Sequence, residues 1–117
     1  MIAAGSGTRI VIARRPVDFR KQADSLAALV AADLAQDPYS GTIYVFRSKR
    51  RDRIKLVGFD GSGLWLFAKR LETGRFEWPE IADGVMTMSA AQLAALLDGV
   101  DWRRVAMPNM RRPSAVR

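Results

Sequence analysis

The residue types in this 117-residue chain exclude most catalytic chemistry, because the sequence contains no histidine and no cysteine. Without imidazole or thiol groups there is no histidine base, no Ser-His-Asp or Cys-His pair, and no zinc site with nitrogen or sulfur ligands. A metal would have to bind carboxylates, as magnesium and manganese do. The acidic residues that lie near predicted turns are Asp52, Asp60, Glu72, Glu77, Glu80 and Asp83.

Phosphodiester cleavage at a magnesium site would require two or three of those carboxylates to converge, and nothing in their spacing requires it. The chain also has no Gly-x-x-x-x-Gly-Lys phosphate loop and no dinucleotide-binding fingerprint. We therefore predict a binding protein with no catalytic residues, no metal and no cofactor. A carboxylate-metal nuclease is the enzymatic alternative.

Basic residues are the chemically distinctive feature of the sequence. The net charge is +7, a balance that favours polyanions as partners. The positive charge is concentrated between residues 47 and 75, which include nine basic residues and three acidic ones. Residues 76–101 carry five acidic residues and no basic one, and residues 102–117 carry five arginines. The pattern predicts separate surfaces for separate partners, or a basic tail that folds back on the acidic segment. The alternative is a set of solvated loops whose charges average out.

Aromatic residues accompany the basic ones in the middle of the chain. Lysine and arginine neutralise phosphates, and flat rings stack on bases, so the combination suits single-stranded or distorted nucleic acid. The predicted nucleic-acid-binding residues are Arg47, Lys49, Arg50, Arg51, Arg53, Lys55, Trp65, Phe67, Lys69, Arg70 and Arg75. The alternative is that Trp65, Phe67 and Phe59 form a second core, covered by the first helix or a partner subunit, with the basic end of the face solvated.

Secondary structure must position these residues. β-Branched or alternating segments predict strands at residues 9–13, 42–47, 53–60 and 64–70, with a short edge strand at 75–79 and a brief extended piece at 85–88. Asp18 is a candidate N-cap for an amphipathic helix that runs to Gln36. Ser89 and Gln92 form a capping box for a second helix, which ends at Gly99.

The short loops predict antiparallel hairpins, and a symmetric pairing places Arg47 opposite Arg53 and Asp60 opposite Leu64. One face of the sheet would then be apolar, formed by Tyr44, Phe46, Ile54, Leu56, Leu64, Leu66 and Ala68. The other face would be graded from basic to aromatic, formed by Arg47, Arg53, Lys55, Lys69, Ile43, Val45, Val57, Phe59, Trp65 and Phe67. A bulge in the loop 61–63 would slip one strand and exchange its faces.

The expected fold is α+β, an antiparallel sheet of about four to six strands with two helices packed mainly on one face. We expect a single domain over residues 1–106 and a basic, disordered tail over residues 107–117. No apolar run is long enough to cross a bilayer, and the first residues lack the pattern of a signal peptide. We therefore expect a cytoplasmic protein that does not bind membranes.

Several short motifs together resemble one protein family. They are Asp18-Phe19-Arg20-Lys21, Asp37-Pro38-Tyr39-Ser40-Gly41, Val45-Phe46-Arg47, Arg51-Asp52-Arg53-Ile54-Lys55, Asp60-Gly61-Ser62-Gly63-Leu64-Trp65-Leu66-Phe67, Lys69-Arg70-Leu71-Glu72-Thr73-Gly74-Arg75-Phe76 and Trp78-Pro79. From about Thr8 to Arg104 the chain is similar to the second-open-reading-frame (TnpB-type) accessory proteins of insertion sequence sixty-six elements.

The resemblance implies a bacterial transposable-element protein that acts beside a separate transposase, which itself carries the acidic strand-transfer triad. The family supplies no established catalytic residues to assign here. The implied partners are DNA and the transposase of the same element, and the sequence leaves homo-oligomerisation open. Our hypothesis is a non-catalytic transposition factor that binds element DNA or the transposase-DNA complex. The alternative is a protein adaptor that docks the transposase, with DNA contact only secondary.

Overall fold

The short β-branched segment near the start of the chain lies inside the sheet of the computed structural model, which describes residues 7–83 and 85–105. The five strands lie in the order β4-β3-β2-β1-β5. In chain order the elements are β1 (Ile10–Ala13), α1 (Ala23–Asp33), β2 (Ile43–Arg47), β3 (Arg53–Phe59), β4 (Leu64–Arg70), β5 (Val85–Thr87), α2 (Ala90–Leu97) and the 3-10 helix η1 (Trp102–Arg104).

The sheet is mostly antiparallel, which confirms the predicted α+β class. β1 and β2 are its one parallel pair among the described strands, and α1 makes the crossover that a parallel connection requires. β2, β3 and β4 form two antiparallel hairpins, and β5 adds antiparallel to β1.

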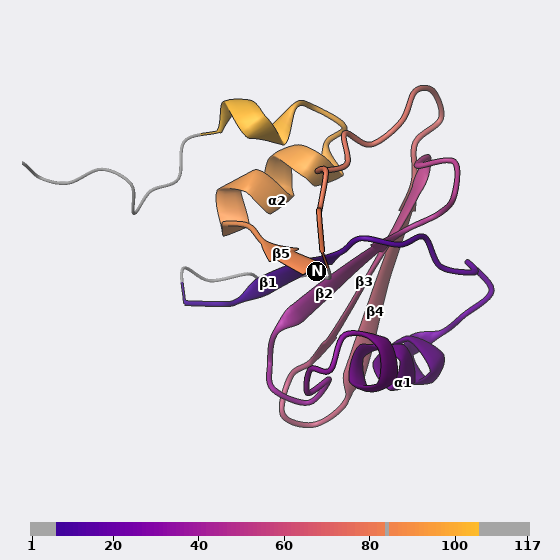
Figure 1. Ribbon diagram of the computed structural model, residues 1–117, viewed down its shortest axis with the longest axis vertical. Coiled ribbons are helices and arrows are strands. Elements are labelled where there is room, and N and C mark those ends of the chain that lie inside the picture. Colours follow the sequence, from indigo (N-terminus) through magenta and orange to yellow (C-terminus); the bar gives the residue numbers. More distant parts are fainter. Residues whose placement is uncertain (1–6, 84, 106–117) are drawn as a thin grey trace, which may run out of the picture.

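The two helices cover opposite faces of the sheet (Figure 1). α1 buries Leu26 and Val30 in one core cluster, and α2 buries Leu93 and Leu96 in another. The expectation that both helices pack mainly on one face was therefore wrong. The β1-α1-β2 crossover occupies the first face, which we call the α1 face. The helix α2, which follows β5, packs on the second, the α2 face.

Two helix boundaries test the capping predictions. The α2 capping box is confirmed, because the Ser89 hydroxyl accepts from the Gln92 N–H and the Gln92 side chain accepts from the Ser89 N–H, both at 3.0 Å. The first helix begins at Ala23 rather than after Asp18. Asp18 instead closes a turn, in which its carboxylate accepts from the Arg20 N–H at 3.0 Å.

β3 is displaced by one residue from the predicted register at both hairpins. Arg47 pairs with Ile54, and Phe59 pairs with Leu64. Since side chains alternate along a strand, every β3 side chain lies on the face opposite to the predicted one, while β2 and β4 keep their predicted faces. Ile54 and Leu56 therefore lie on the α2 face, and Lys55 lies on the α1 face.

Residues 75–79 do not form the predicted edge strand. They run over the α2 face, where Phe76 and Trp78 are buried in the core. The Trp78 indole N–H donates to the Ala13 carbonyl at 3.0 Å and fixes this segment to the end of β1. The predicted tail at 107–117 lies outside the described residues. Within the described residues, no helix is long and apolar enough to cross a membrane.

Candidate nucleic-acid interface

The loop between β2 and β3 and the segment after β4 meet at one end of the sheet (Figure 1). The Leu71 N–H donates to the Asp52 carbonyl at 2.8 Å, and the Phe76 N–H donates to the Arg51 carbonyl at 2.7 Å. These bonds bring together six exposed cationic side chains, which we call the basic end: Lys49, Arg50, Arg51, Arg53, Arg70 and Arg75.

Few acidic groups neutralise the basic end. The Asp52 carboxylate accepts from the Ser48 hydroxyl at 3.1 Å inside the loop. Glu72 pairs with Arg70 at 3.4 Å, and both side chains are more than half exposed, so the pair contributes little. The cluster therefore carries a strong net positive charge.

Arg53 and Arg70 lie directly opposite each other on β3 and β4. Like charges at directly opposed positions of an antiparallel pair destabilise the sheet. The stability of the hairpin therefore does not explain this arrangement, and an anion bound between the two guanidinium groups would remove their repulsion.

Two predicted binding lysines have internal roles instead. Lys55 is 5% exposed, and its ammonium donates to the Phe19 and Lys21 carbonyls, both at 2.7 Å. Burial lowers the pKa of Lys55. The Lys69 ammonium donates at 2.6 Å to the carbonyl of Leu97, the last residue of α2, where a cation suits the helix dipole.

Arg47 is also half-buried. Its terminal guanidinium nitrogens donate to the Ser48 and Arg14 carbonyls, both at 3.4 Å, and its buried Nε has no hydrogen-bond partner among the described residues. Burial, and secondarily the charge of Arg51, lowers the pKa of Arg47. The structure therefore does not place Arg47, Lys55 or Lys69 among the freely exposed cations of the basic end.

The predicted aromatic residues are half-buried. Trp65 and Phe67 pack against the core cluster of the α2 face. The indole of Trp65 lies over Gly58, its cross-strand partner, so closely that a side-chain carbon on Gly58 would be 2.7 Å from the ring carbon Cε2. Much of each ring is thus engaged within the protein, in line with the second-core alternative. The helix on this face is α2 rather than the first helix, and Phe59 lies on the α1 face.

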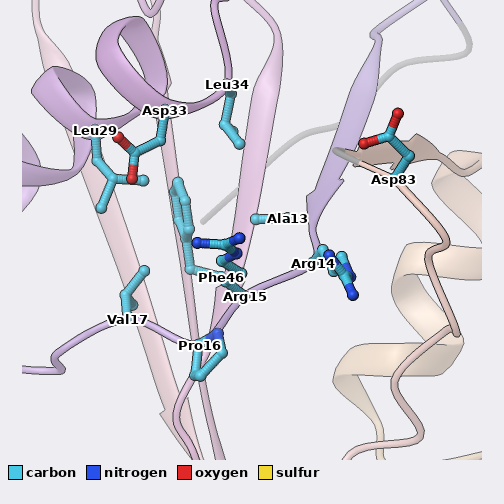
Figure 2. Close-up of a pocket in the computed structure, with 10 residues that line it drawn as sticks. All are labelled: Ala13, Arg14, Arg15, Pro16, Val17, Leu29, Asp33, Leu34, Phe46 and Asp83. Atoms are coloured by element: carbon cyan, nitrogen blue, oxygen red, sulfur yellow. The ribbon is translucent and has the colours of Figure 1, made fainter.

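The sequence prediction did not include a second basic feature, at the end of β1. Arg14 and Arg15 are exposed and border a cleft of about 480 Å³ (Figure 2). Arg15 lies on the side of Phe46 and α1, and Arg14 on the side of Asp83. The signal that could have shown it is the pair of consecutive arginines between a strand and Pro16.

Part of the acidic segment is neutralised within the protein. Arg103 pairs with Asp101 at 2.8 Å and with Glu77 at 3.1 Å, and the Trp102 indole N–H donates to the Glu77 carbonyl at 2.6 Å. The hydrogen bond from Arg103 lowers the pKa of Asp101. Arg103, the first arginine of the C-terminal basic segment, thus neutralises part of the acidic one. Among the described residues no three acidic side chains gather to hold a metal ion.

Fold and surface together define a small α+β protein whose principal chemical feature is a cationic sheet end. The family model described as IS66 Orf2 like protein matches residues 8–107. The chain belongs to this family, which confirms the resemblance and points to an accessory role in transposition.

Two relatives come from Sinorhizobium fredii (strain NBRC 101917 / NGR234). Uncharacterized protein y4jC is 45% identical over 116 residues, which cover 99% of each chain. Uncharacterized protein y4hO is 41% identical over 103 residues, which cover 88% of this chain and 90% of the relative. No solved structure matches the chain.

Proposed function

We propose that this protein is a non-catalytic transposition factor that binds DNA of its element, alone or in complex with the transposase, through the basic end. The observation that carries the proposal is the convergence of six exposed cations, including the opposed pair Arg53 and Arg70. Membership of the IS66 Orf2 family supports the connection to transposition.

The chemistry of the basic end favours contact with phosphates. Its side chains are guanidinium groups and one ammonium on loops and strand ends, which suits an extended polyanion. Such contacts hold a protein on the nucleic-acid backbone but do not read the base sequence. We therefore propose that sequence choice is left to the transposase.

The alternative function is an adaptor that docks the transposase. The cleft at Arg14 and Arg15 favours it, because apolar walls from Leu29, Leu34 and Phe46 lie beside two exposed guanidinium groups. That combination fits a partner segment with an apolar side chain next to carboxylates. In this case DNA contact at the basic end would only add affinity.

Two charge-matched double variants test the main proposal. K49E/R50E reverses two charges of the basic end. R9E/R104E makes the same change in net charge, at exposed positions before β1 and in η1. Fluorescence anisotropy with labelled DNA should show a large loss of affinity for K49E/R50E and a small loss for R9E/R104E. Equal losses, or no DNA binding by the unaltered protein at low salt, would refute the proposal. Transposase capture lost on Arg14→Glu with DNA affinity intact would support the adaptor.

A further inference from the structure

β4 is an edge strand whose outer backbone groups have no partner within the described residues. The bonds from Leu71 to Asp52 and from Asp60 to Gly63 belong to the β3-β4 ladder. Because antiparallel pairs alternate, residues 65, 67 and 69 direct their N–H and C=O groups toward β3. Residues 64, 66, 68 and 70 therefore direct theirs outward.

The side chains of this edge strand are unusually apolar for a strand with no partner. Residues 64–67 are all large and apolar, and each is only half-buried. Proteins usually protect long edges with proline, bulges or charges, and here charges occur only at Lys69 and Arg70. The opposite edge, β5, is only three residues long.

We propose that β4 pairs antiparallel with the β4 of a second copy of this chain, centred on Phe67. In this register residue 64 faces the partner's residue 70, and residue 66 faces the partner's residue 68. Each of these pairs occurs twice by symmetry and exchanges two hydrogen bonds, so all eight outward N–H and C=O groups of each strand are used. A shift by two residues in either direction leaves some of them unpaired.

The side chains complement each other in the same register. On the α2 face Trp65 lies opposite the aliphatic stem of the partner's Lys69, and the two Phe67 rings meet at the axis. On the α1 face Leu64 lies opposite the partner's Arg70. A shift by four residues toward the basic end would instead oppose the two Lys69 side chains. The apolar contacts at the axis and the backbone hydrogen bonds thus favour the same register, and the inference does not depend on DNA binding.

A matched pair of substitutions at Leu64 tests this register. In the monomer Leu64 lies opposite Phe59, an uncharged residue, so L64E and L64K lose the same apolar contact. In the dimer the new side chain of each copy faces the partner's Arg70, so the contact occurs twice by symmetry. Sedimentation equilibrium should therefore give a dimer dissociation constant roughly tenfold lower for L64E than for L64K. Equal constants, or a monomer throughout a dilution series of the unaltered protein, would overturn the proposal.

The absence of cysteine permits a second test that does not depend on charge. Residues 67 of the two copies form a non-hydrogen-bonded pair, whose Cα separation of about 4.5 Å suits a disulfide. F67C should form a cross-linked dimer rapidly under mild oxidation. The control T87C, an exposed position on the β5 edge, should not. Cross-linking of F67C no faster than T87C would contradict pairing through β4.

Discussion

The nine cationic side chains between residues 47 and 75 differ in what their charged groups contact. Six are exposed at the basic end, whereas Arg47, Lys55 and Lys69 donate hydrogen bonds to backbone carbonyls. Lys55 connects β3 to the turn before α1, and Lys69 connects β4 to the end of α2. At the scale of single residues, a basic side chain in this chain has either a structural role or a free charge.

Removal of the Lys55 charge should therefore destabilise the protein, whereas removal of the Arg53 charge, two residues away on β3, should not. Lys55→Met leaves two carbonyls without their donor and should cost roughly 1.5–3 kcal/mol of unfolding free energy. Arg53→Met removes a like-charge opposition to Arg70 and should leave stability unchanged or slightly higher. Urea unfolding measures both effects. Under our proposal DNA affinity should fall for Arg53→Met and hold for folded Lys55→Met, and the reverse pattern would contradict this division of roles.

At the scale of elements, the sequence predicted the strands β1 to β4 and the helix α2 well, but not the register of β3. The loop between β2 and β3 closes at Ser48 and Arg53, with Arg51 at φ 65°. A non-glycine residue rarely adopts this conformation, so the sequence does not indicate it. At the other hairpin Asp60 pairs with Gly63 rather than Leu64, because its carboxylate accepts from the N–H groups of Ser62 and Gly63.

The cross-strand contact between Gly58 and Trp65 should make Gly58 intolerant of any side chain. Gly58→Ala would force the indole or the backbone to move, at a cost of roughly 1–3 kcal/mol in unfolding free energy. Gly63→Ala is the matched control, because no atom lies within 4 Å of its added carbon. That change should stay within about 0.5 kcal/mol in the same thermal or urea unfolding experiment. Similar losses for both variants would mean that Trp65 does not lie over Gly58.

The half-buried position of Trp65 also predicts how its removal divides between stability and binding. Full burial would give a loss of roughly 3–5 kcal/mol for Trp→Ala, so a half-buried ring should cost somewhat less, about 2–3 kcal/mol. Affinity for single-stranded DNA should change little if phosphate contacts dominate. If a base stacks on Trp65, the substitution should instead weaken binding by roughly 1–3 kcal/mol. Thermal unfolding beside binding curves distinguishes the two. Unchanged melting with lost single-strand binding would restore the stacking interpretation.

For the whole molecule, the charge pattern along the sequence anticipated part of the candidate site. The exposed loop and strand-end cations could be predicted, because such positions are solvated in almost any register. The roles of Lys55, Lys69, Trp65 and Phe67 could not, because they depend on which face each strand presents and on where α2 ends. Distant contacts fix both features, so local sequence patterns do not contain them.

The salt dependence of DNA binding should distinguish a localised site from attraction by the net charge of +7. If the six cations of the basic end each displace one counterion, log affinity should fall against log salt with a slope of about −5 for duplex DNA. This corresponds to a loss of about 10³-fold between 50 and 200 mM salt. A slope near zero for the unaltered protein would exclude phosphate contact at the basic end.

The slopes of the two charge-matched variants complete this test. K49E/R50E removes two phosphate contacts, so its slope should be about 2 units shallower than that of the unaltered protein. R9E/R104E should keep the full slope, because its substituted residues lie outside the basic end. A general attraction between a basic protein and DNA would instead change both slopes equally, since both variants have the same net charge. Titrations over a range of salt concentrations therefore show whether the six cations act as one site.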